Sequence, residues 1–169
     1  MLSLRRRLAA LVYTAGDDPD TILSDFAVDL NSRGFRVVGM VQTGACADST
    51  LSAVLVHNSE TLPLAQDHDS NLKGCRLEIS RLENAGARIA DAIADGADLV
   101  IINRFGKREQ KGEGLAYLVE TAFGAGIPVI TAVATQRLDD WIKFTNGTGE
   151  TLPCQRNALE AWWRNLSTQ

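Results

Sequence analysis

Cationic side chains concentrated in one short segment are the clearest sign of binding chemistry in this sequence. Four of them fall within eight residues of the stretch LVIINRFGKREQKGEG: Arg104, Lys107, Arg108 and Lys111. A guanidinium group donates to two oxygens of an oxyanion at once, and an ammonium adds a point charge. A solvated charged loop is the alternative, because Glu109 and Glu113 lie among the cations. The residues that we expect in a ligand site are Arg76, Asn103, Arg104, Lys107, Glu109 and Lys111.

Carboxylates gather in a second stretch, LVYTAGDDPDTILSDF, where a short apolar run ends at a glycine before a helix. A phosphate-binding loop has this layout and the pattern G-x-x-x-x-G-K-[ST]. If Thr21 takes the hydroxyl position, Asp20 replaces the lysine and Pro19 replaces the second glycine. Proline removes an N–H donor, and the aspartates would repel phosphate. We expect a capped strand-to-helix turn; the alternative is that the aspartates hold a divalent cation.

The stretch NLKGCRLE places Cys75 beside two cations, Lys73 and Arg76, which would favour its thiolate if the side chain is exposed. No histidine within this motif could serve as its base, so we interpret Cys75 as a buried structural cysteine. The soft metal ligands of the middle region match no zinc spacing; they are Cys46, His57, His68 and Cys75. No nucleophilic triad is readable. We therefore expect neither a metal nor a cofactor.

Bulk composition limits the class of protein. A chain of 169 residues, 45% hydrophobic and 22% charged, suits one α/β domain spanning residues 1–169. Its net charge of −4 argues against nucleic-acid binding, which favours a basic face. No apolar run approaches the roughly 20 residues of a membrane span, and the run at 8–13 is short for a leader peptide. We expect a cytoplasmic protein without membrane insertion and, with three distant cysteines, without a disulfide framework.

Buried strands alternate with amphipathic helices along the chain. Strands are predicted at 8–14, 35–43, 99–105 and 127–133. Helices are predicted at 19–33, 79–95, 115–123, 136–146 and 157–166. An insertion at about 46–74 carries a small β-hairpin, 52–57 with 61–64, and 106–113 is a polar loop. The alternation predicts a mostly parallel sheet of about five strands with helices on both faces. Ligands of such sheets bind beyond the carboxyl ends of the strands, where both charged stretches lie.

Five stretches, in this order, resemble a bacterial family of unknown function: LVYTAG, LNSRGFRVVGMVQT, KGCRLE, LVIINRFGKREQKGEGL and GIPVITAV. Members of that family tend to be encoded near molybdenum-transport and molybdoenzyme genes. The match covers residues 8–153, and INRFGKRE and GCRLE are its most specific parts. The resemblance implies a molybdenum-linked accessory role by association.

More distantly, the layout resembles the small P-loop nucleoside triphosphatases, with RG-x-x-V-x-G-h-x-T at 33–43 and DE-x-G-x-x-E at 103–109. Gly106 and Glu109 are retained, whereas Asn103 and Arg104 replace the two acids. This resemblance implies a P-loop-NTPase-like fold with degenerate Walker motifs. It also implies that the first and third buried strands are neighbours, with Arg76 reaching the crevice at their ends.

Three functions are open at this point. The first is a non-catalytic accessory or binding protein of a molybdenum-related pathway, which binds a small oxyanion, a phosphorylated ligand or a protein partner at 103–111. The second is a divergent nucleoside triphosphatase that uses Glu109. The third is a regulatory interaction module without a small ligand, acting through the tryptophan-bearing C-terminal helices, with a homodimer as one form. We expect the first, because Asp20 and Asn103 replace the lysine and the acid of a hydrolase.

Overall fold

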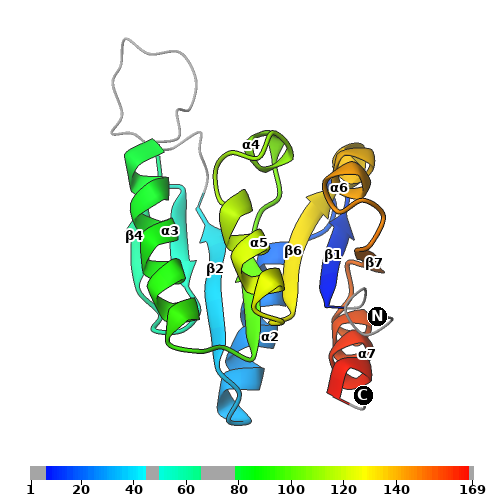
Figure 1. Cartoon of the computed structure of the whole chain (residues 1–169), viewed down its shortest axis with the longest axis horizontal. Coiled ribbons are helices and arrows are strands. Elements are labelled where there is room, and N and C mark those ends of the chain that lie inside the picture. The colour runs from blue at the N-terminus through cyan, green and yellow to red at the C-terminus, as the bar shows by residue number, and fades with distance from the viewer. Residues whose placement is uncertain (1–6, 45–49, 66–78, 168–169) are drawn as a thin grey trace.

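One mixed sheet forms the centre of the computed structural model, which describes residues 7–44, 50–65 and 79–167 (Figure 1). Its seven strands lie in the order β4-β3-β2-β5-β6-β1-β7. Their bounds are β1 Leu8–Tyr13, β2 Val37–Thr43, β3 Ser52–Leu55, β4 Thr61–Pro63, β5 Leu99–Ile102, β6 Val129–Ala134 and β7 Glu150–Pro153. The strands from β2 to β7 in this order are parallel. The predicted hairpin extends the sheet, with β3 antiparallel to β2 and β4 antiparallel to β3.

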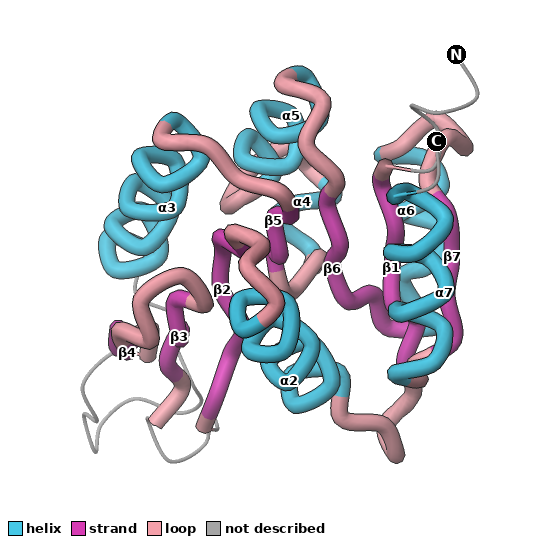
Figure 2. Tube along the Cα trace, turned by 90° about the horizontal axis from the view of Figure 1, so that it is seen from below, coloured by secondary structure: helices cyan, strands magenta, loops and turns pink. Residues whose placement is uncertain are grey.

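Helices cover both faces of this sheet. Their bounds are α2 Pro19–Ser32, α3 Ile79–Ala94, α4 Lys107–Gln110, α5 Ala116–Gly124, α6 Leu138–Phe144 and α7 Arg156–Ser167, with a 3-10 turn, η1, at Thr135–Arg137. Figure 2 shows α3 and α5 on one side of the strands and α2 on the other. None of the helices in the described ranges is both long and apolar enough to cross a bilayer. The predicted α/β class is therefore confirmed, and the arrangement is consistent with a P-loop-NTPase-like fold.

The apolar strands divide their side chains between two cores, which is why they read as continuous runs in the sequence. In β1, Leu8 and Ala10 belong to the core that contains the buried side chains of α3 and α5, whereas Ala9 and Leu11 belong to the core that contains those of α2 and α7. Successive side chains of a strand point to opposite faces, so a strand with helices on both sides needs apolar residues at every position.

Gly39 sets the contact between the two strands that matter most for the site. It lies in the middle of β2 with φ +132°, opposite Ile101 of β5. A Cβ at this position would overlap the carbonyl oxygen of Ile101. Only glycine adopts this conformation and this approach readily, so Gly39 keeps the carboxyl ends of β2 and β5 together.

The sheet order corrects one prediction about neighbours. The first and third buried strands, β1 and β5, are not adjacent, because β6 lies between them and pairs with both. All of β6 up to Val133 is buried, which suits a central strand. The end of β1 and the start of α2 nevertheless reach the residues after β5, because Tyr13 lies beside the Arg104 guanidinium and Asp20 accepts from Asn103 and Arg104.

Several element bounds also differ from the sequence prediction. The strand predicted at 99–105 ends at Ile102, and the loop predicted at 106–113 contains α4. The helix predicted at 136–146 begins as η1 and ends at Phe144. β7 was not predicted, because this edge strand pairs only with β1 and alternates exposed with partly buried residues, including Pro153.

Candidate functional site

A pocket of about 250 Å³ opens at the carboxyl end of β5, where β2, α3 and α4 meet it. We call it the cation pocket. Its polar wall consists of Gln42, Asn103, Arg104, Lys107, Arg108 and Glu109. Four of the six expected ligand residues thus line one pocket, and Gln42 at the end of β2 was missed. The strand-end rule alone could have identified Gln42, since it ends a buried parallel strand.

Asn103 lies at the base of the cation pocket and is fully buried. Its Nδ2 donates to the Asp20 carboxylate. Its Oδ1 has no hydrogen-bond partner within the part of the chain that the structure describes. A buried acceptor without a donor is costly, by about 1–3 kcal/mol. Asn103 is therefore a buried side chain beside the pocket with one satisfied and one unsatisfied polar atom.

Arg104 is held in place by two neighbours and keeps its charge. Its guanidinium donates to Asp20 Oδ2 at 2.7 Å and lies 5.7 Å from the centre of the Tyr13 ring. Burial acts to lower the pKa of Arg104, but the hydrogen bond and charge of Asp20 outweigh it and raise that pKa above its ordinary value. Asp20 therefore neutralises much of the positive charge that Arg104 brings to the pocket.

Glu109 is buried and holds the loop around the pocket in its shape. Its Oε2 accepts from the backbone N–H of Gly106 at 3.0 Å, and its Oε1 accepts from that of Leu115 at 3.3 Å. Gly114 has φ +59°, and a Cβ there would collide with the Glu109 carboxylate. Both carboxylate oxygens serve the loop, so Glu109 is placed as a structural residue.

The remaining cations differ in where they lie. Lys107 is exposed and Arg108 partly buried, and both line the cation pocket. Within the described ranges neither side chain has an ion pair. Lys111 caps the end of α4, is exposed and lies outside the pocket lining. Arg76 lies outside the described residues, as does Cys75.

The aspartate turn after β1 uses its carboxylates internally. Asp17 Oδ2 accepts from the backbone N–H of Thr14 at 2.9 Å, and Asp18 accepts from the backbone and hydroxyl of Thr21. The Thr21 hydroxyl, and then its backbone N–H, lower the pKa of Asp18. Asp18 is the N-cap of α2 and a proline begins the helix, so the predicted capped turn is confirmed.

Asp20, the third carboxylate, leaves this turn and binds three residues that line the cation pocket: Gln42, Asn103 and Arg104. Its Oδ1 accepts from the backbone N–H of Gln42 at 3.1 Å. Among the described residues no three His, Cys, Asp or Glu side chains are grouped so that they could hold a metal ion. His57, on the hairpin, has a pKa lowered by its burial and lies away from this site.

The comparisons with known proteins give a family and a relative. A family model described as "Protein of unknown function (DUF2478)" matches residues 8–162. The chain is 40% identical over 167 residues to the molybdenum import ATP-binding protein ModC 2 of Bradyrhizobium diazoefficiens. The match covers 96% of this chain and 19% of that protein, so the chain spans about a fifth of the relative's length. No solved structure matches. The chain belongs to the DUF2478 family of proteins of unknown function.

Proposed function

We propose that this protein is a binding module of a molybdenum-related pathway, and that the cation pocket binds a small oxyanion or a phosphorylated ligand. The observation that carries the proposal is the charge balance of the pocket. Arg104 is paired with Asp20, and both oxygens of Glu109 accept from backbone N–H groups. Lys107 and Arg108 then supply two positive charges with no ion pair in the described part of the chain.

The molybdenum link rests on the relative. Its name assigns it to molybdenum import and to ATP binding. The part of it that matches this chain is about a fifth of its length. A segment of that size is compatible with an accessory unit, and we propose an accessory role for this chain in the same pathway. Molybdate is itself a tetrahedral oxyanion, so it belongs among the ligands to test.

Binding is proposed in preference to hydrolysis because of three positions. Asp20 stands where a phosphate-binding lysine would stand, and Asn103 stands where the acid of a hydrolase would stand. Glu109, the remaining acid, holds the loop. We expect no magnesium-dependent release of phosphate from ATP or GTP above background. Turnover that disappears in Glu109→Gln would replace the binding function with a divergent hydrolase.

The interaction-module alternative relied on the tryptophans of the C-terminal helices. Trp141 and Trp162 are buried in the two cores, and Trp163 is only 7% exposed. Their side chains serve packing, which favours the pocket over these helices as the functional surface. A protein partner or homodimer acting elsewhere on the surface is the function to consider if no anion binds.

The test is a calorimetric titration of phosphate, sulfate, molybdate and tungstate into wild type, Lys107→Ala and Lys111→Ala. Losing a charge-assisted contact should weaken binding by roughly 10- to 150-fold in Lys107→Ala. Lys111→Ala is the matched control, because it removes the same charge from the same loop but outside the pocket. Equal effects of the two substitutions, or no binding tighter than about 1 mM by wild type, would reject the proposal.

A further inference from the structure

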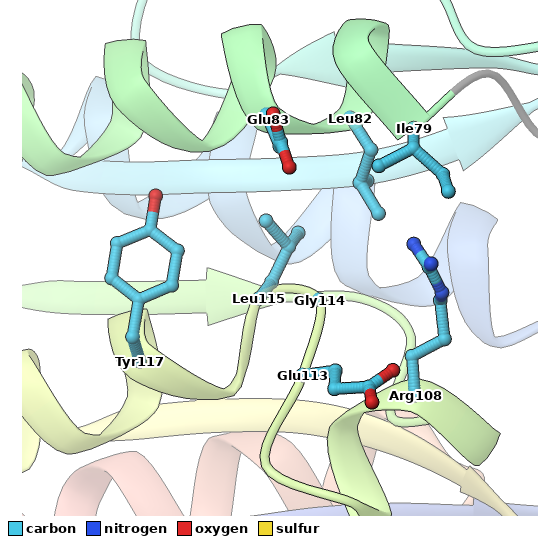
Figure 3. A pocket seen from close by; sticks show the side chains of 8 residues that line it. All are labelled: Ile79, Leu82, Glu83, Arg108, Glu113, Gly114, Leu115 and Tyr117. Carbon is cyan, nitrogen blue, oxygen red and sulfur yellow. The ribbon is translucent and has the colours of Figure 1, made fainter.

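A second pocket of about 270 Å³ adjoins the cation pocket (Figure 3). The two share Leu82, Arg108 and Leu115 as common walls. The second pocket is completed by Ile79, Glu83, Glu113, Gly114 and Tyr117, and we call it the acidic pocket. Arg108 extends from α4 toward Ile79 in Figure 3, so its side chain stands at the boundary between the two pockets.

The acidic pocket combines apolar walls with hydrogen-bond acceptors. Leu82 and Leu115 are buried, whereas Ile79 is 48% exposed and Tyr117 is 45% exposed. The carboxylates of Glu83 and Glu113 make no hydrogen bond or ion pair within the described ranges. Apolar side chains with free acceptors at their edge suit a flat ring that carries N–H donors, because the ring faces are apolar and its edge is polar.

Size favours one ligand across both pockets. Sites for ligands of this kind usually measure about 300–1,000 Å³. The cation pocket and the acidic pocket, at about 250 and 270 Å³, are each below that range and together reach it. The cation pocket alone suits a tetrahedral oxyanion, and the acidic pocket adds room for a heterocycle attached to it.

The charges of the two pockets would orient such a ligand. Lys107, which lines the cation pocket alone, attracts an anionic group to that end, and Arg108 attracts it at the boundary, whereas Glu83 and Glu113 repel it from the acidic pocket.

We propose that the two pockets form one site for a phosphorylated nitrogen heterocycle, with its phosphate at Lys107 and Arg108 and a ring edge of N–H donors at Glu83 or Glu113. This inference rests on the proposed function, since it uses the cation pocket for the anion. The site lies at the ends of β5 and α3, apart from the turn after β1 where a phosphate-binding loop would lie. GMP is the simplest probe, because guanine presents adjacent N–H donors that a carboxylate accepts together.

The experiment compares GMP, AMP, guanosine and inorganic phosphate on wild type by calorimetry. We expect GMP to bind at least about tenfold more tightly than phosphate and than guanosine, because each of these two fills only one of the pockets. AMP should bind more weakly than GMP, because adenine lacks the N1–H donor. GMP that binds no more tightly than phosphate would overturn this inference while the proposed function stands.

Variants then separate the two ends of the site. Glu113→Gln or Glu83→Gln should weaken GMP binding about tenfold or more. Neither substitution should weaken phosphate binding, because each removes a charge that repels an anion. Lys107→Ala should weaken both. Glu120→Gln is the control, because Glu120 is an exposed acid of α5 outside the pocket lining. If neither Glu113→Gln nor Glu83→Gln affects GMP, the heterocycle assignment is wrong; if no anion binds to wild type at all, the proposed function fails with it.

Discussion

The turn after β1 and the loop after β5 lie at the same edge of the sheet, and each carries several charges of one sign. They differ in how many of these charged groups have hydrogen-bond or ion-pair partners. The aspartates of the first are all used: Asp17 and Asp18 by their own turn, and Asp20 by Asn103 and Arg104. In the loop after β5, only some of the cations have an ion-pair partner. Arg104 is paired, whereas Lys107 and Arg108 face a pocket.

The comparison teaches that local charge density does not distinguish a binding loop from a structural turn. What distinguishes them is whether backbone donors or opposite charges already satisfy each group. A short side chain such as aspartate reaches the N–H groups of its own turn. Lys107, by contrast, lines a pocket, has no ion pair among the described residues and retains its charge for a ligand.

The largest expected effect on stability comes from Asp20→Ala, which breaks the link between the two regions. Three donors would lose their acceptor: the Gln42 backbone, the Asn103 amide and the Arg104 guanidinium. Because the Asn103 amide is fully buried, we expect a loss of about 3 kcal/mol. Thermal melting should show a decrease of roughly 6–12 °C. A decrease below about 2 °C would mean that the link is dispensable.

Asp20→Lys tests whether the turn after β1 could bind phosphate. The substitution restores the lysine of a phosphate-binding loop but places its ammonium beside Arg104, with Pro19 still present. We expect no ATP affinity in this variant. Micromolar ATP binding measured by calorimetry would show that the turn is preformed for phosphate despite its proline.

Glu109→Gln should have the next largest effect. The amide keeps one acceptor but turns an NH₂ group toward the backbone N–H of Gly106 or of Leu115. Two donors then face each other in a buried place, at a cost of about 2 kcal/mol. Urea unfolding should show a lower midpoint, with Glu120→Gln as an exposed control. An unchanged midpoint would leave Glu109 free for a role in ligand chemistry.

Asp18→Ala removes the N-cap of α2 and should cost about 1 kcal/mol at neutral pH. The pKa of Asp18 is lowered by its bonds to Thr21, so its stabilising effect is present above the ordinary aspartate pKa and is lost as pH falls through the lowered value. The difference in stability between wild type and Asp18→Ala should therefore shrink below about pH 4. A difference that is constant from pH 7 to pH 2 would show that the charge of Asp18 is irrelevant.

The smallest expected effect belongs to Tyr13→Leu, which removes the ring beside the Arg104 guanidinium. The contact is partly exposed, so the loss should be about 0.5 kcal/mol. Anion affinity of the cation pocket should change less than twofold, because Asp20 still positions Arg104. A larger change in affinity would show that the ring, and not the carboxylate, orients this side chain.

The elements that were predicted well are those with strong local signals. Buried apolar runs identified β1 and β6, and the Asp18-Pro19 start with the Gly34 stop located α2 within two residues. The short edge strand β7 has no such signal, because its four residues alternate between partly buried and exposed and form no apolar run. The interposition of β6 between β1 and β5 is likewise a property of the whole sheet.

For the site, the residue types identified the cationic loop. They did not show which of its residues line the pocket and which hold the loop in shape. Nothing in the sequence shows that Glu109 would fold back onto Gly106 and Leu115, since that depends on the path of the loop. Lys107 and Lys111 look equivalent as a pair of lysines, but in the structure only Lys107 lines the pocket, whereas Lys111 follows the last residue of α4 and lies outside the lining. Arg108, one of the residues shared by both pockets, was recognised as a cation but not selected as a ligand residue.

Gly39 has a consequence for how substitutions would be tolerated along the chain. It touches neither pocket, yet any side chain there would wedge β2 from β5 and separate Gln42 from Asn103. In a saturation-mutagenesis screen for binding, substitutions at position 39 should abolish binding, as substitutions of a ligand-contacting residue would. In a parallel screen for folding the same variants should be lost, which would show that glycine is needed there for the contact between the strands.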